Sequence, residues 1–245
     1  MKHFIKTFVF GGLGGAVFLF AFVPLVYRYN FLGSARIIDQ VIPARTEVIK
    51  VEKEVVTFVS EDGQAEEAVK KSQESLVVIK SFSGGAVLRF GTGIALTRDG
   101  LILVVNQVVP VEAQDYQVFN GDKILKAQVV YRNTKKNLAI LKVADESLVP
   151  ATFDEGELAV GNIAWVVGKV AVLQKPEVFL NRALVSLVDS QRKRIVLDGR
   201  YENYLSGAGL VSKNGAFKGI VYVDGSKIIA LPSSFVKEFV DGYLK

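Results

Sequence analysis

Short apolar runs, each bounded by turn residues, repeat from residue 76 to residue 230 of the chain. Glycine-containing turns such as Asn120-Gly121-Asp122 and Lys213-Asn214-Gly215 separate neighbouring runs and are typical of β-hairpins. The predicted strands are residues 76–81, 86–90, 93–96, 101–105, 117–118, 127–131, 138–143, 163–167, 177–187, 194–198, 209–212, 216–223 and 227–230. Strands this short and this frequent favour an all-β barrel or sandwich.

Two segments have a helical pattern instead. Residues 64–72 carry Glu66 and Glu67 near their start and Lys70 and Lys71 near their end, which suits the dipole of a short helix. A second helix is predicted to start after Pro232 and to close the chain. The apolar residues that this closing helix places on one face are Phe235, Val236, Phe239, Val240 and Tyr243.

Residues 8–27 carry no charged side chain and are bounded by Lys6 and Arg28. A run of about 20 apolar residues is long enough to cross a bilayer as a helix. We therefore predict one N-terminal transmembrane helix within a membrane anchor of residues 1–30. A cleaved signal peptide is the alternative, but its apolar region is usually shorter, and no clean small-x-small cleavage site follows closely.

The flanking charges do not decide the orientation of this helix, because basic residues lie on both sides of it. Few residues precede the helix, so the simplest arrangement keeps the N-terminus inside and translocates the rest. This arrangement predicts a single-pass membrane protein with an extracytoplasmic C-terminal domain. Residues 31–63 form a predicted spacer in which residues 46–59 partly alternate apolar and charged side chains, as a stalk or an added strand would.

Composition excludes several kinds of chemistry. The chain has no cysteine, and its one histidine is His3, so disulfides and ordinary zinc sites are not expected. We predict no metal site and no cofactor. The net charge is +5, but the basic residues are scattered, so no nucleic-acid partner is predicted. The tightest basic cluster, Arg192-Lys193-Arg194, is predicted to cap an exposed hairpin.

The segment from Asn203 to Val211 places Ser206 among small residues, immediately before an apolar pair. Small neighbours let the backbone turn tightly, which is how a β-protease exposes its nucleophilic hydroxyl. Taken alone, the segment is better explained as an ordinary Ser-Gly loop.

The register around Ser206 changes this interpretation. Residues 197–211 align without a gap with Thr-Asp-Ala-Ala-Ile-Asn-Pro-Gly-Asn-Ser-Gly-Gly-Pro-Leu-Val, the active-site pattern of trypsin-like serine proteases of the HtrA/Deg type. Residues 91–96 resemble the Gly-Ser-Gly-Phe strand of that family, and residues 99–109 resemble its Gly-Tyr-Ile-Leu-Thr-Asn-Asn-His-Val-Val segment. Residues 137–143 resemble its Asp-Leu-Ala-Val-Leu-Lys segment. The resemblance covers residues 64–245.

This resemblance implies a trypsin-like double six-stranded β-barrel with a C-terminal helix, and the chain ends without room for the PDZ domain that many relatives carry. Ser206 stands at the nucleophile position, Gln107 at that of the histidine, and Asn137 at that of the aspartate. The oxyanion-hole region corresponds to Tyr204, Leu205 and Ser206, with Tyr204 replacing a glycine. A side chain at that position disfavours a positive backbone φ.

An amide takes no proton at neutral pH, so Gln107 cannot activate Ser206 as a general base, and Asn137 lacks the charge that stabilises an imidazolium. These substitutions predict a pseudoprotease that binds peptide or protein segments by strand addition. Three alternatives stay open. The domain could be a scaffold with a vestigial cleft, a regulatory partner of an active protease homologue, or an active serine endopeptidase that uses a lysine as a non-standard base. Assembly into a homo-oligomer is compatible with each of them.

Overall fold

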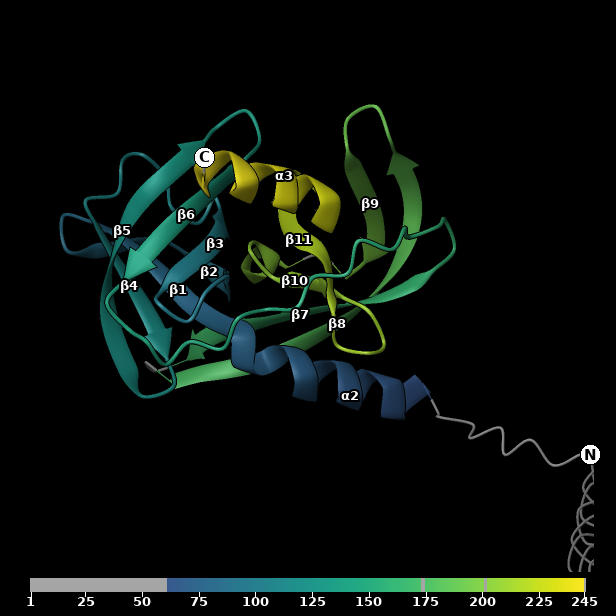
Figure 1. Ribbon diagram of the computed structural model, residues 1–245, viewed down its shortest axis with the longest axis horizontal. Coiled ribbons are helices and arrows are strands. Elements are labelled where there is room, and N and C mark those ends of the chain that lie inside the picture. The colour runs from purple at the N-terminus through teal and green to yellow at the C-terminus, as the bar shows by residue number, and fades with distance from the viewer. Residues whose placement is uncertain (1–60, 173–174, 201, 245) are drawn as a thin grey trace, which may run out of the picture. The chain divides into compact units, whose positions relative to one another are not determined.

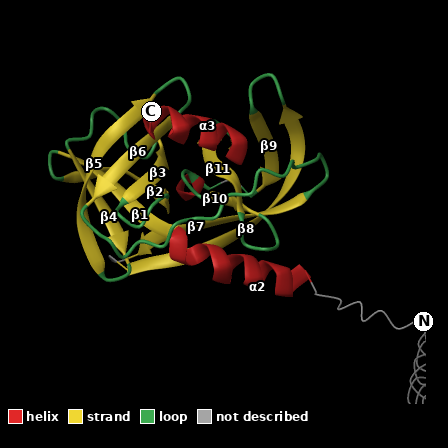
Figure 2. Cartoon of the chain, viewed as in Figure 1, coloured by secondary structure: helices red, strands yellow, loops and turns green. Residues whose placement is uncertain are grey.

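Two closed β-barrels of six strands each follow one another along the chain. Figure 1 colours them by position in the chain, and Figure 2 draws their strands in yellow. The computed structural model describes residues 61–172, 175–200 and 202–244. All named strand pairs are antiparallel, which short hairpin connections allow. The double six-stranded barrel predicted from the sequence is confirmed.

The first barrel is closed by pairing of its first and fourth strands, in the order β1-β2-β3-β6-β5-β4. Its strands are β1 (Leu76–Ser83), β2 (Ala86–Ala95), β3 (Leu101–Val105), β4 (Asp115–Asn120), β5 (Lys123–Asn133) and β6 (Leu138–Val143). The prediction of separate strands at 86–90 and 93–96 was wrong, because β2 runs through Gly91 and Gly93 without a break. A Cβ atom on Gly93 would overlap Ile79 and Ile102, so this glycine serves close packing inside the barrel.

The second barrel has the order β10-β11-β12-β9-β8-β7. Its strands are β7 (Ile163–Val172), β8 (Lys175–Asp189), β9 (Arg194–Gly199), β10 (Gly209–Val211), β11 (Phe217–Asp224) and β12 (Lys227–Pro232). Strand β10 is much shorter than its neighbour β11. The backbone pairing of β11 on the side of β10 therefore ends near Val221, whereas its pairing with β12 on the other side continues to Asp224.

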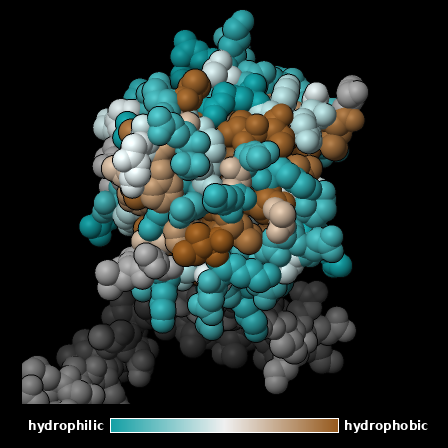
Figure 3. Space-filling view, turned by 90° about the vertical axis from the view of Figure 1, so that its left-hand side faces the viewer, coloured by the Kyte–Doolittle hydropathy of each residue, from teal (hydrophilic) through white to brown (hydrophobic). Residues whose placement is uncertain are grey.

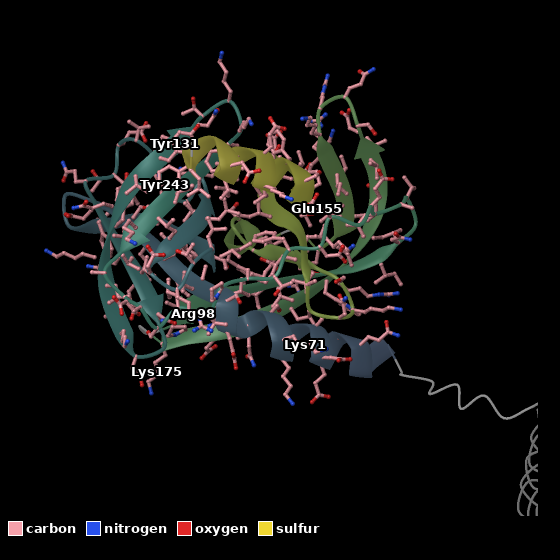
Figure 4. All side chains as sticks on the ribbon, viewed as in Figure 1. Lys71, Arg98, Tyr131, Glu155, Lys175 and Tyr243 are labelled. Carbon is pink, nitrogen blue, oxygen red and sulfur yellow. The ribbon has the colours of Figure 1, made fainter. Side chains whose placement is uncertain are left out.

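Helix α2 (Glu61–Ser72) and the short 3-10 helix η1 (Gln73–Ser75) lead into the first barrel, and helix α3 (Ser233–Leu244) closes the chain. Both α-helices were predicted, although α2 begins three residues earlier than expected. Phe239 of α3 is buried and stacks on Tyr131 of the first barrel, with ring centroids 5.1 Å apart. Tyr131 also contacts Tyr243, and Figure 4 labels both tyrosines near the C-terminal end of α3.

Glu238 on α3 connects the two barrels through ion pairs. Lys136, in the turn between β5 and β6, lies 2.9 Å from the Glu238 carboxylate, and Lys193, in the turn between β8 and β9, lies 2.7 Å from it. Hydrogen bonds from Lys193 and Lys136 lower the pKa of Glu238 to about 2. The turn that carries Lys193 is the exposed hairpin predicted from the basic cluster.

The predicted transmembrane segment, residues 8–27, lies outside the described residues, as does most of the predicted spacer. Among the helices that the structure describes, none is both long and apolar enough to cross a membrane.

We expect the Glu238 ion pairs to make stability depend on acidic pH. The ordinary pKa of a glutamate, 4.5, falls to about 2 at Glu238, so the pairs stabilise the fold above about pH 4.5 and are lost as pH falls toward 2. Glu238→Gln should lower the melting temperature at pH 7 by about 1–4 °C and change it little at pH 2. Thermal melts followed by circular dichroism measure this. Glu66→Gln, at an exposed glutamate on α2 without a described ion pair, is the control, and an equal effect of both substitutions would contradict the prediction.

Candidate functional site

Ser206 lies in a tight turn between the 3-10 helix η2 (Asn203–Leu205) and strand β10. Leu205 anchors this turn, because its side chain is fully buried in the core of the second barrel. Gly207 follows with a φ of 90°, a conformation that suits glycine, and its N–H donates to the carbonyl of Val221 at 2.7 Å. The turn leaves only 7% of Ser206 exposed.

The Ser206 turn is docked against strand β2 of the first barrel. The backbone N–H of Thr92 donates to the Ser206 carbonyl at 3.1 Å. The Thr92 hydroxyl also bonds the backbone of Lys169 on β7, where it donates to the carbonyl and accepts from the N–H, both at 3.0 Å. A Cβ on Gly91 would overlap the Ser206 carbonyl, and a Cβ on Gly207 would overlap the Thr92 carbonyl. This junction therefore depends on two glycines.

Gln107 lies just after β3 and binds the second barrel with both halves of its amide. Its Oε1 accepts a hydrogen bond from Ser206 Oγ at 3.2 Å, and its Nε2 donates to the carbonyl of Val223 at 2.8 Å. The orientation of the amide follows from chemistry, because a backbone carbonyl can only accept and must face the nitrogen. The structure thus brings Gln107 and Ser206 together across the two barrels.

Asn137 has a different environment. It lies at the end of the turn between β5 and β6 with a φ of 55°, a left-handed conformation that asparagine tolerates. Its carbonyl accepts from the backbone N–H of Asn106 at 3.1 Å, next to Gln107 in the chain. Its side chain makes no hydrogen bond to any residue that the structure describes. The structure therefore connects Asn137 to Gln107 through the backbone and not through a side-chain hydrogen bond.

The turn before Ser206 is helical rather than open. Tyr204 lies within η2. Among the described non-glycine residues, only Asn137 and Lys193 have a positive φ, so the expectation that Tyr204 avoids positive φ is confirmed. The Tyr204 ring packs edge-on against the Phe179 ring, with ring centroids 4.8 Å apart. The Leu205 N–H is held by the Glu202 carbonyl at 3.1 Å. An oxyanion hole needs backbone donors that converge on the substrate, and within this turn the Leu205 donor is engaged by the Glu202 carbonyl instead.

A cleft of about 630 Å³ opens beside Ser206. It is lined by Leu88, Arg89, Phe90, Gln107, Val108, Ser206, Val223 and Gly225. Within this described lining, Arg89 carries the one charge, and neither a lysine nor a carboxylate is present. Figure 3, which turns the first barrel toward the viewer, shows hydrophobic patches on a largely hydrophilic surface. Exposed apolar residues of that barrel include Val87 and Phe90 on β2.

Three residues of the site, Arg89, Thr92 and Val223, were not predicted from the sequence. Thr92 lies within a segment that resembles the protease family, which is a usable signal. Arg89 and Val223 carry no such signal, because their roles depend on how the two barrels meet and on where β10 ends.

Comparison with known proteins agrees with this geometry. Residues 91–220 match the family model of the trypsin-like peptidase domain, and the chain belongs to that family. A crystal structure of the serine endoprotease from Yersinia pestis superimposes with a TM-score of 0.64 at 18% sequence identity. The match covers 73% of this chain and 66% of that chain, and at this identity it shows a shared fold. A comparison with curated protein sequences found no match.

We predict that Gly207→Ala disrupts the docking of the Ser206 turn. An alanine there combines a strained positive φ with overlap of the rigid Thr92 backbone, so the free energy of unfolding should fall by about 2–4 kcal/mol. Gly121→Ala is the matched control, because Gly121 has a φ of 58° with nothing near its missing Cβ. The control should lose about 1 kcal/mol. Urea denaturation compares the two variants, and equal losses would show that crowding at Thr92 is unimportant.

Proposed function

We propose that this domain is a catalytically inactive member of the trypsin-like peptidase domain family that binds extended peptide or protein segments in the cleft beside Ser206. The observation that carries the proposal is the hydrogen bond from Ser206 Oγ to Gln107 Oε1. The hydroxyl that a protease would activate here donates a hydrogen bond to an amide oxygen, while the cleft around it remains open.

The chemistry of this pair supports inactivity. A serine hydroxyl attacks a carbonyl efficiently when an adjacent base removes its proton. An amide oxygen accepts a hydrogen bond but does not take the proton at neutral pH, and an amide nitrogen that already donates to Val223 cannot act as a base either. Loss of one triad member typically reduces the rate by several orders of magnitude.

The surroundings of Ser206 also disfavour the lysine-assisted alternative. Burial lowers the pKa of Lys169, opposed by the nearby charge of Glu74, and a lowered pKa is what a lysine base needs. Lys169, however, is not among the residues that line the cleft. The charged residue in the lining is Arg89, and a guanidinium stays protonated and cannot accept a proton.

The edge of β11 supports binding by strand addition. Val221 directs its backbone N–H and carbonyl toward the Ser206 turn, where they bond Ala208 and Gly207. Backbone groups two residues apart in a strand point to the same side, so Val223 directs its N–H and carbonyl into the cleft. There the Val223 carbonyl is occupied by Gln107 Nε2. A peptide that pairs with this edge must therefore displace the Gln107 amide.

We also propose that residues 8–27 anchor the domain to a membrane and that the domain is extracytoplasmic. The length of the charge-free run between Lys6 and Arg28 supports the anchor.

We predict that a fluorophosphonate probe does not label Ser206, because labelling requires an activated hydroxyl. Mass spectrometry of the full chain after incubation with the probe measures this, with an active trypsin as the positive control. Labelling that disappears in Ser206→Ala, or Ser206-dependent cleavage of peptides, would contradict inactivity and favour the endopeptidase alternative.

We predict that Gln107→Ala strengthens peptide binding. The substitution frees the Val223 carbonyl for the peptide backbone, and removal of one competing hydrogen bond should lower the Kd about 3–10-fold. Fluorescence anisotropy of labelled extended peptides measures Kd. Gln128→Ala, at an exposed glutamine of β5 outside the cleft lining, should leave Kd unchanged. Weaker or equal binding by Gln107→Ala would argue against pairing at Val223.

A further inference from the structure

We propose that the cleft beside Ser206 selects acidic peptide segments and that Arg89 is the residue that recognises their carboxylates. This inference rests on the proposed peptide-binding function and adds the chemical class of the ligand. Four observations carry it, namely the position of Arg89, its lack of a carboxylate partner, the apolar walls around it and its place opposite the edge of β11.

Strand register places Arg89 on the cleft side of the first barrel. Arg89 on β2 pairs with Ser81 on β1, and residues directly opposite in an antiparallel pair share one face of the sheet. The Ser81 hydroxyl donates to the carbonyl of Val108, the residue after Gln107. Arg89 thus lies on the face that contacts the Gln107–Val108 segment, and it lines the cleft together with Ser206 and Val223.

The guanidinium of Arg89 is exposed and has no acidic partner among the described residues. Its one described hydrogen bond runs from Nη1 to the carbonyl of Leu88 at 3.0 Å, which leaves most of its five N–H donors to solvent. Some basic residues elsewhere on the domain are neutralised, since Lys142 pairs with Asp99 and Lys218 pairs with Asp154. Arg89 therefore retains an unneutralised, forked donor set that matches the geometry of a carboxylate.

The charge of Arg89 would affect the affinity for a bound peptide. An extended segment on the edge of β11 would cover the cleft and remove water from Arg89, which penalises a charge that gains no partner. A glutamate or aspartate side chain offsets this penalty with a charge-assisted hydrogen bond, whereas a lysine side chain is repelled. The walls formed by Leu88, Phe90 and Val108 suit apolar side chains of the same segment. The preferred ligand therefore alternates apolar and acidic residues.

The test uses three fluorescein-labelled peptides with the sequence Thr-Val-Xaa-Val-Xaa-Val-Thr, in which Xaa is glutamate, glutamine or lysine. They share length and strand propensity and differ in charge. Anisotropy titrations of the purified full chain in detergent solution should give a Kd about five-fold lower for the glutamate peptide than for the glutamine peptide, with the lysine peptide weakest. Raised salt should reduce the difference.

Four variants assign the preference to Arg89. Arg89→Ala should bind the glutamate and glutamine peptides equally, and Arg89→Glu should prefer the lysine peptide. Arg89→Lys keeps the charge without the fork and should retain part of the preference. The matched control is Arg98→Ala, which changes the net charge as Arg89→Ala does. Arg98 is exposed between β2 and β3, lies outside the cleft lining and is labelled in Figure 4. Circular dichroism verifies that each variant is folded.

The outcomes separate this inference from the function on which it rests. Equal Kd values for the glutamate and glutamine peptides would contradict recognition by Arg89 and leave peptide binding intact. A preference lost equally in Arg98→Ala would show that overall charge, not the cleft, is responsible, which also contradicts the inference. Failure of all three peptides to bind the parent chain and Gln107→Ala alike would contradict the proposed function itself.

Discussion

Two closed barrels cannot join by sharing a strand, because every strand in each barrel already pairs on both sides over much of its length. The Ser206 turn meets this constraint by placing its backbone directly against β2, where the Thr92 N–H holds the Ser206 carbonyl. The two backbones can approach this closely because Gly91 and Gly207 have no side chain, and a Cβ atom at either position would overlap the facing backbone. The position of Ser206 is therefore set by the joining of the barrels, independently of any chemistry that its hydroxyl performs.

The Gln107 amide completes this junction and is also the basis of the proposed inactivity. A neutral imidazole has one donor nitrogen and one acceptor nitrogen, and a primary amide likewise offers a donor and an acceptor. Gln107 can thus link Ser206 and Val223 as a donor-acceptor bridge between the barrels. What distinguishes the amide from an imidazole is basicity, so the substitution keeps a hydrogen-bonded connection and removes proton transfer.

Much of this fold could be predicted from the sequence, because short apolar runs, turn glycines and the register of residues 197–211 are local signals. The errors have physical causes. Gly91 and Gly93 resemble a break between strands, yet β2 continues through them, since the missing side chains serve close contacts inside the barrel and at the junction. The roles of Arg89 and Val223 could not be predicted, because they depend on the lengths of β10 and β11 and on the face of β2 that meets Gln107. The resemblance of residues 137–143 to the protease family identified the position of Asn137. The conformation of the turn between β5 and β6 decides which hydrogen bonds Asn137 makes, and this could not be predicted.

The atoms that this cleft would use for binding differ from those that a protease uses for hydrolysis. Hydrolysis requires a base and converging backbone donors for an oxyanion. In this cleft the group beside Ser206 is the Gln107 amide, and the Leu205 N–H donates to the Glu202 carbonyl within η2. Strand addition requires backbone groups on an exposed edge, which Val223 supplies, and discrimination between peptides requires walls and charge, which Leu88, Phe90 and Arg89 supply. None of these binding features depends on deprotonation of Ser206. An amide in place of the base is therefore compatible with a surface that binds peptides, because that surface uses other atoms.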